Sequence, residues 1–274
     1  LRATPRAFAR FVPERADDIA WENDLIACRT YGPALRAGPE DSGIDIWLKR
    51  VPWPIIDKWY HEDRVKVLNS KGSKSYHEDH GEGYDAYKVG DSRGCGGISI
   101  WRDGQPRNSD TFIAHRMIED TPRRVAFELD YASTDGDHIV RETRRITVVA
   151  GQRLFQCESR FTIDGKAAAI PVAIGLKPQA KDTVPVFAKD KGTMWMWETV
   201  DGLGLGTGIA VDPQRITGMI THTDPAGQVQ ALCLATTDKT GYIRWFSGYG
   251  WEGQGEITTG NAWQAYLGKF AGKF

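Results

Sequence analysis

The sequence predicts an all-β protein, specifically a large antiparallel β-sandwich, from three observations. Segments in which apolar and polar residues alternate with a period of two dominate the chain. Turn-forming residues separate these segments, and convincing amphipathic helices are scarce. A chain of 274 residues with this many strands is long enough to form two stacked sheets rather than a small barrel. A single domain spanning residues 1–274 is expected, because no linker or repeat divides the chain.

Four segments carry the clearest strand pattern: residues 125–131, 139–149, 154–163 and 229–235. Turns are expected at residues 134–137, 150–152, 164–166 and 225–227, where Gly, Asp and Pro gather. Residues 141–163 therefore predict one long hairpin that turns at Gly151. Polar residues at alternate positions from Arg141 to Thr147 are typical of an antiparallel sheet with one wet face. One short helix is expected from Ile55 to Tyr60 and just beyond.

Glycines recur at alternate positions across residues 202–208, but the segment does not match a dinucleotide-binding turn. It predicts a loop with closely packed backbone or a strand with bulges. The four cysteines are far apart and form no C-x-x-C pair, which excludes a cysteine-based zinc motif. They are interpreted as small buried hydrophobes, and disulfides are left open: Cys28, Cys95, Cys157 and Cys233.

The charge balance excludes some classes of partner. A net charge of −1 argues against a general nucleic-acid or membrane-surface binder. No apolar run approaches the roughly 20 residues that a membrane-spanning helix needs. We therefore expect neither nucleic acid nor membrane as a partner, and the oligomeric state is left open. The chain begins with Leu, as a processed secreted precursor or a trimmed chain would.

The densest group of titratable residues is the segment 76–87, Tyr-His-Glu-Asp-His-Gly-Glu-Gly-Tyr-Asp-Ala-Tyr. It combines two histidines, four carboxylates and three tyrosines with two glycines that let the backbone bend. These groups supply the acids, bases and metal ligands available near neutral pH. The segment is therefore a candidate active site. The alternative is a solvated, hydrogen-bonded turn before a strand.

The same segment could hold a metal site. His77 and His80 are three positions apart, whereas a zincin helix places its two histidines four apart. Glycines follow at once, so a helical zinc site is excluded. A loop could still gather His77, His80 and Glu82, with His61, around Zn or Ca. Apart from this divalent ion, no cofactor is expected.

A second polar cluster covers residues 10–24, and other candidates are scattered. Its residues Trp21 and Asn23 share one strand face while Glu22 lies on the other. The alternative is a charged edge strand that prevents pairing with other chains. The ten tryptophans and nine tyrosines suit sugar stacking, although they could equally fill a core. His222 could point into a cleft from a strand, and Trp197 is a weaker candidate.

Three motifs together resemble the DUF4861 family of bacterial proteins. They are the segment 10–24 (RFVPERADDIAWEND), the run Arg29-x-Tyr31-Gly-Pro33, and the segment 76–84 (YHEDHGEGY). The resemblance covers nearly the whole chain. It implies a galactose-mutarotase-like β-supersandwich, a role in polysaccharide degradation and a periplasmic or secreted location. It also implies a dehydratase acting on uronic-acid oligosaccharides from the algal polysaccharide ulvan.

The implied reaction is the elimination of water from a uronate. The expected partner of the protein is therefore its substrate, an acidic oligosaccharide. The elimination needs a base for the C5 proton, a partner for the carboxylate and an acid for the leaving oxygen. The resemblance implies His77 or His80 as base and Tyr84 as acid, with Arg29 and Asn23 gripping the carboxylate. Further substrate contacts are expected from seven residues: Arg10, Trp21, Glu22, Tyr31, Glu82, His222 and Trp197.

Three other functions stay open on the sequence. A polysaccharide lyase would use the same elimination with a sugar as the leaving group. A glycoside hydrolase would need two carboxylates about 5 to 9.5 Å apart, for which Glu22 and Glu82 are the candidates. A non-catalytic carbohydrate-binding module would need only an aromatic platform.

Overall fold

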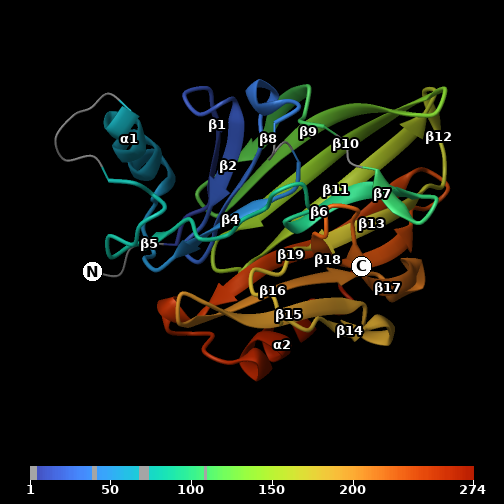
Figure 1. Ribbon diagram of the computed structural model, residues 1–274. Coiled ribbons are helices and arrows are strands. Elements are labelled where there is room, and N and C mark those ends of the chain that lie inside the picture. Colours follow the sequence, from blue (N-terminus) through green and yellow to red (C-terminus); the bar gives the residue numbers. More distant parts are fainter. Residues whose placement is uncertain (1–4, 39–41, 68–73, 108–109) are drawn as a thin grey trace.

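The computed structural model describes residues 5–38, 42–67, 74–107 and 110–274, and within them strands form three antiparallel sheets (Figure 1). The strands stack in layers, so the prediction of an all-β antiparallel sandwich is confirmed. Four short 3-10 helices lie in connections: η1 (Pro33–Leu35), η2 (Lys189–Lys191), η3 (Pro213–Arg215) and η4 (Glu252–Gln254). Among the described residues, neither α-helix has the length and apolar character that crossing a bilayer requires.

The first sheet has five strands in chain order. They are β1 (Phe8–Val12), β2 (Asp18–Glu22), β3 (Ala27–Thr30), β4 (Asp45–Lys49) and β5 (Gly83–Tyr84). Helix α1 (Ile56–Val67) covers the outer face, where Trp59 and Tyr60 pack on Trp47. The predicted helix near residue 55 is thus confirmed. The edge-strand alternative for the second polar cluster is wrong for its β2 part, because β2 pairs with β1 on one side and β3 on the other, whereas Arg10 lies on β1, the edge strand of this sheet.

A nine-stranded sheet forms the opposite layer, in the order β14-β15-β16-β19-β11-β10-β9-β8, with β12 paired to β11. Its strands are β8 (Ala114–Asp120), β9 (Arg124–Asp135), β10 (His138–Val149), β11 (Leu154–Ile163), β12 (Lys166–Ala167), β14 (Val186–Ala188), β15 (Thr193–Val200), β16 (Leu203–Val211) and β19 (Tyr242–Trp251). The predicted long hairpin is confirmed, because β10 and β11 pair in one register from Val140–Ile163 to Thr147–Gln156.

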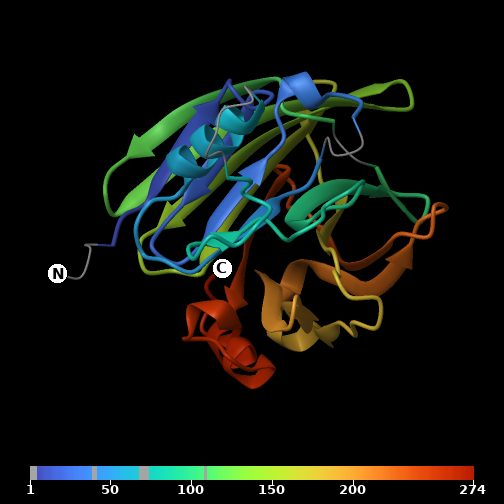
Figure 2. The same ribbon diagram turned by 60° about the vertical axis from the view of Figure 1, so that its left-hand side comes forward.

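The third sheet runs in the order β17-β18-β13-β6-β7. Its strands are β6 (Cys95–Arg102), β7 (Gln105–Arg107), β13 (Pro171–Leu176), β17 (Ile216–Thr223) and β18 (Val229–Thr236). A bridge between Ile44 and Gly94 links it to the first sheet. Both five-stranded sheets contribute to one apolar cluster with the nine-stranded sheet. Figure 2 shows the blue strands of the first sheet between α1 and the long green strands of the nine-stranded sheet.

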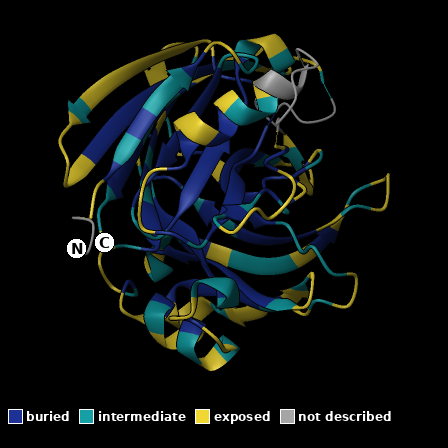
Figure 3. Ribbon diagram, turned by 90° about the vertical axis from the view of Figure 1, so that its left-hand side faces the viewer, coloured by how far each residue is buried: buried dark blue, intermediate teal, exposed yellow. Residues whose placement is uncertain are grey.

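The aromatic and sulfur-containing residues mostly fill this interior. Seven of the ten tryptophans are buried, for example Trp21, Trp245 and Trp251, which are 0% exposed. Large aromatic rings bury much apolar area, so this placement favours the core-filling interpretation over a sugar platform. All four cysteines are buried and free, as expected for small hydrophobes. Figure 3 shows the buried residues in dark blue between the layers.

The glycine-rich segment forms strand β16, which pairs in unbroken register with both β15 and β19. Of the two expected alternatives, the loop is wrong and the strand is confirmed, but its pairing shows no bulge. The glycines leave room for helix α2 (Gly260–Gly268), a helix that the sequence pattern did not reveal. A Cβ added at Gly206 would lie 2.5 Å from Trp263, and one at Gly208 would lie 2.9 Å from Leu267.

Candidate active site

The loop before β5 is fixed to the first sheet by its glycines and one carboxylate. Gly81 and Gly83 have φ angles of 99° and 111°, values that side chains rarely allow. Oδ1 of Asp79 accepts hydrogen bonds from both of their N–H groups, at 2.8 and 3.2 Å. A Cβ at Gly83 would lie 1.8 Å from the carbonyl oxygen of Leu48 on β4. The predicted glycine-bent loop is confirmed.

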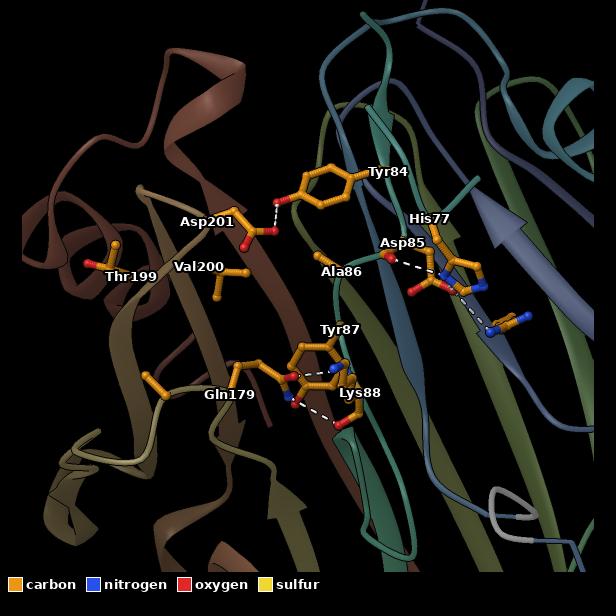
Figure 4. Close-up of a pocket in the computed structure, with 12 residues that line it drawn as sticks. His77, Tyr84, Asp85, Ala86, Tyr87, Lys88, Gln179, Thr199, Val200 and Asp201 are labelled. Atoms are coloured by element: carbon orange, nitrogen blue, oxygen red, sulfur yellow. Dashed lines mark hydrogen bonds and ion pairs between the residues drawn. The ribbon is translucent and has the colours of Figure 1, made fainter. Parts of the chain in front are cut away.

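A cleft of about 550 Å³ opens beside this loop (Figure 4). One wall is the chain that follows β5. The other wall combines the connection after β13 with the turn between β15 and β16. Its lining residues are Arg29, His77, Tyr84, Asp85, Ala86, Tyr87, Lys88, Gln179, Ala180, Thr199, Val200 and Asp201. The first sheet and the nine-stranded sheet therefore build the cleft together.

His77 lies at the cleft with one ring nitrogen occupied. Its Nδ1 is 3.2 Å from the carbonyl oxygen of Asp85 and 3.5 Å from Oδ2 of the same residue. Both of these atoms accept hydrogen bonds, so in the neutral imidazole the hydrogen lies on Nδ1 and the lone pair on Nε2. The side chain is 59% exposed, which leaves Nε2 accessible. His77 can therefore accept a proton from a bound molecule.

Arg29 is buried next to Asp85, and its guanidinium group forms ion pairs with carboxylates of the protein. Its Nη2 lies 3.2 Å from Asp85 and its Nε 2.8 Å from Asp45, while Asp18 lies 3.8 Å from Nη1. Burial by itself would lower the pKa of Arg29, but the carboxylates of Asp45 and Asp85 raise it well above its ordinary value. Because its side chain is 4% exposed, Arg29 holds Asp85 in place instead of gripping a substrate carboxylate. The expected role is corrected accordingly.

Tyr84 faces the opposite wall and donates a 2.8 Å hydrogen bond to Asp201. Asp201 and Gly202 form the two-residue turn between β15 and β16, with φ angles of 48° and 83°. Both positive values are those of the tight hairpin turn that Asp-Gly favours. Burial, and then the hydrogen bond to Asp201, raise the pKa of Tyr84 well above its usual range. Tyr84 is therefore a protonated donor.

The far end of the cleft is fixed by a chain of hydrogen bonds. The amide of Gln179 accepts from the Lys88 N–H at 2.8 Å and donates to the Lys88 carbonyl at 3.2 Å. The Glu198 carboxylate accepts from the N–H groups of Gln179 and Ala180 at 2.7 and 2.9 Å. Burial raises the pKa of Glu198. These bonds tie the two walls together.

His80 and Glu82 lie outside this cleft, and the expected metal set is not assembled. Glu82 accepts hydrogen bonds from Trp53 and Lys58, each at 2.9 Å, and the nearest carboxylate to His80 is Glu78 at 3.8 Å. Across residues 5–38, 42–67, 74–107 and 110–274, no three His, Cys, Asp or Glu side chains are grouped as metal ligands. These residues do not fit the expected Zn or Ca site.

Four expected substrate contacts are buried, which corrects that expectation. Trp21 is 0% exposed and packs against core phenylalanines, and Tyr31 is 1% exposed beside Arg29. The side-chain nitrogen of Asn23 donates to two backbone carbonyls of the β10–β11 turn region, each at 2.7 Å. The Glu22 carboxylate accepts from backbone N–H groups at the start of α1. All four serve the fold.

Three further candidates lie away from the cleft. Arg10 of β1 pairs with Glu14 and with Asp57 of α1. His222 is 8% exposed on the third sheet, where it stacks edge-on against Trp101. Trp197 packs with the α2 cluster on the outer face of the nine-stranded sheet. The expectation that Arg10, His222 and Trp197 contact the substrate is therefore wrong for this cleft.

Sequence reasoning missed most of the lining residues, among them Asp85, Lys88, Gln179 and Asp201. Asp85 stood inside the quoted segment, and the Asp201-Gly202 pair between two strands is a recognisable hairpin signal. Lys88 and Gln179 carry no local signal. Their pairing joins positions 91 residues apart, which only the folded chain brings together.

Comparisons with known proteins cover nearly the whole chain. The model of a family described as "Domain of unknown function (DUF4861)" matches residues 2–274. "Uncharacterized protein P7" from Formosa agariphila is 32% identical over 286 residues, which cover 99% of this chain and 68% of that protein.

A solved structure, "Putative kojibiose phosphorylase from human microbiome", matches with a TM-score of 0.53 at 10% identity. The match covers 98% of this chain and 35% of that structure, so this chain spans about a third of its length. At this identity the likeness is one of fold.

Proposed function

The chain belongs to the DUF4861 family, and we propose that it is a carbohydrate-active enzyme, a carbon–oxygen lyase that removes water from a terminal uronate of an acidic oligosaccharide. Oligosaccharides derived from ulvan are the substrates of first choice, and a periplasmic or secreted location goes with that role. The volume of the cleft, about 550 Å³, suits such a ligand, since ligand sites span about 300 to 1,000 Å³.

The observation that carries the proposal is the pairing of an acceptor and a donor in one cleft. His77 presents a free Nε2 because Asp85 occupies Nδ1. Tyr84 presents a phenol that keeps its proton because burial and Asp201 raise its pKa. A proton acceptor and a proton donor in fixed positions are what a β-elimination requires.

The proposed step balances as follows. Nε2 of His77 takes the proton from C5 of the uronate, and the electron pair left behind forms the C4–C5 double bond. The C4–O bond breaks, and the leaving oxygen takes the proton of Tyr84 to depart as water. The leaving oxygen replaces Asp201 as the acceptor of the Tyr84 hydrogen bond. Solvent then removes the proton from His77 and restores that of Tyr84.

The other functions receive less support. The hydrolase alternative relied on Glu22 and Glu82, but neither lines the cleft and Glu22 is 1% exposed. The binding-module alternative relied on a tryptophan platform, but no tryptophan is among the lining residues. A polysaccharide lyase would use the same two groups with a sugar as the leaving group.

The experiment incubates the protein with saturated and unsaturated uronate oligosaccharides and measures product masses. Loss of the mass of one water from the saturated oligosaccharides, without chain cleavage, is the expected result; the unsaturated ones, which have no C5 proton and no C4–O bond, should be left unchanged by this step. Cleavage without a change in total mass indicates a polysaccharide lyase. Cleavage with gain of one water indicates hydrolysis and overturns the proposal, as does no reaction across the panel.

A further inference from the structure

Resting on the proposed function, we infer that Lys88 binds the substrate carboxylate and makes the cleft specific for acidic over neutral saccharides. A uronate elimination develops negative charge next to its carboxylate, so a cation must face that group. Arg29 and Lys88 are the Lys and Arg residues that line the cleft. The surroundings of Arg29 and Lys88 show which of the two can bind the substrate carboxylate.

Arg29 is not available for this role. Two of its nitrogens face Asp45 and Asp85, at 2.8 and 3.2 Å. Aromatic rings of Tyr31 and Trp47 lie 5.6 and 5.4 Å from its guanidinium carbon. A substrate carboxylate would have to displace one of these buried carboxylates and leave it unpaired, at a high cost in free energy.

Lys88 has the opposite character. It is exposed, and none of the ion pairs among the described residues involves its ammonium. Its backbone is nevertheless fixed, because the Gln179 amide bonds both its N–H and its carbonyl. Gln179 is in turn held by Glu198. The ammonium group of Lys88 can therefore pair with a substrate carboxylate, while its backbone is held in place by Gln179.

The segment from Tyr84, the proposed acid, to Lys88 places the ammonium group of Lys88 on the same side as Tyr84. Asp85 and Tyr87 are buried, whereas Tyr84, Ala86 and Lys88 are more exposed. Burial that alternates from one residue to the next is typical of an extended chain, in which successive side chains point to opposite sides. Tyr84, Ala86 and Lys88 therefore share one side of this segment. Figure 4 shows Lys88 and Gln179 at the end of the cleft away from the Tyr84–Asp201 pair. The small side chain of Ala86 leaves room for a sugar ring between them.

The experiment compares two probes, a uronate oligosaccharide and the same oligosaccharide with its carboxyl group reduced to an alcohol. Binding is measured by calorimetry in His77→Gln protein, which prevents turnover. We expect Lys88→Gln to weaken binding of the acidic probe about tenfold to a hundredfold, the loss of one charged hydrogen bond. Binding of the reduced probe stays unchanged, and Lys88→Arg retains most of the affinity for the acidic one.

Three outcomes overturn the inference, and they differ in what they say about the proposed function. Equal weakening of both probes by Lys88→Gln, or no weakening of the acidic probe, removes Lys88 from carboxylate recognition while the proposed function stands. Failure of protein with the native Lys88 to bind either probe overturns the proposed function and the inference together. The thermal unfolding midpoint of Lys88→Gln serves as the control for folding.

Discussion

Tyr84 of the first sheet donates a 2.8 Å hydrogen bond to Asp201, which lies 117 positions later in the nine-stranded sheet. This bond crosses the cleft between its two walls (Figure 4). It raises the pKa of Tyr84 in addition to the larger effect of burial. The proposed acid of the reaction therefore depends on the correct packing of two sheets.

The two histidines of the loop are expected to differ sharply. His77→Gln removes the proposed base, and kcat should fall by about 10²- to 10⁴-fold, the usual contribution of general base catalysis. His80→Gln is the matched control, because His80 belongs to the same loop but does not line the cleft. Steady-state kinetics on the uronate substrate makes the comparison. Equal losses in the two variants would contradict the assignment of His77.

Asp201→Asn should change the pH dependence of the reaction. The active form of Tyr84 is protonated, so kcat/KM falls as pH rises through the pKa of its phenol. Because the Asp201 carboxylate raises that pKa, its removal should lower the pKa and move the alkaline limb to lower pH, toward the ordinary tyrosine value of about 10.

The matched control for this pH profile is Asp164→Asn. Asp164 stands in another positive-φ Asp-Gly turn, and it pairs with His138 away from the cleft. Its variant should keep the alkaline limb of the unmodified protein. An unchanged limb in Asp201→Asn would show that the Tyr84 phenol is not the acid.

The buried ion pair beneath α1 is expected to matter for stability. Lys49 and Glu22 are each 1% exposed and lie 2.5 Å apart. Lys49→Met leaves the Glu22 carboxylate buried without its cation, so the free energy of unfolding should fall by about 3 to 5 kcal/mol. Denaturant unfolding measures the loss.

The double variant Lys49→Met with Glu22→Gln tests the cause of that loss. If the loss comes from an unpaired buried charge, the double variant should lose less than the two single changes added together. Simple additivity of the two losses would contradict the coupling.

The fit of α2 on the glycine-rich strand gives a test of packing. Gly206→Ala forces a Cβ to within 2.5 Å of the Trp263 ring, and overpacking of this kind costs about 1 to 3 kcal/mol. Gly218→Ala is the control, since a Cβ there would lie 3.7 Å from its nearest neighbour, an ordinary contact. Thermal unfolding of the two variants should differ. Equal midpoints would show that Trp263 moves aside without cost.

The sequence predicted the elements whose pattern is local. The hairpin of β10 and β11 followed from alternation around Gly151, and α1 from the residues near Ile55. Helix α2 was not predicted, and β16 was predicted only as a loop or a bulged strand, because a run of glycines does not show which element packs on it. That element, α2, lies far along the chain, and its Trp263 packs on Gly206.

The site was predicted in part for the same reason. The loop of residues 76–87 was recognised from its composition, and it supplies His77, Tyr84 and Asp85. The opposite wall, with Asp201, comes from a hairpin far along the chain; the sequence marks its Asp201-Gly202 turn but does not show which segment that turn faces. Glu22 resembled a site residue because it is polar. In the fold its carboxylate is buried and accepts hydrogen bonds from backbone N–H groups at the start of α1.

The central claim is that His77 removes the proton from C5 of a uronate. A uronate oligosaccharide carrying deuterium at C5 tests it most directly, with the product examined by mass spectrometry. The account predicts that the unsaturated product has lost both one water and the deuterium label, and that His77→Gln forms this product at least about a hundredfold more slowly. A dehydrated product that retains its deuterium, or loss of the label at an undiminished rate in His77→Gln, would contradict the account.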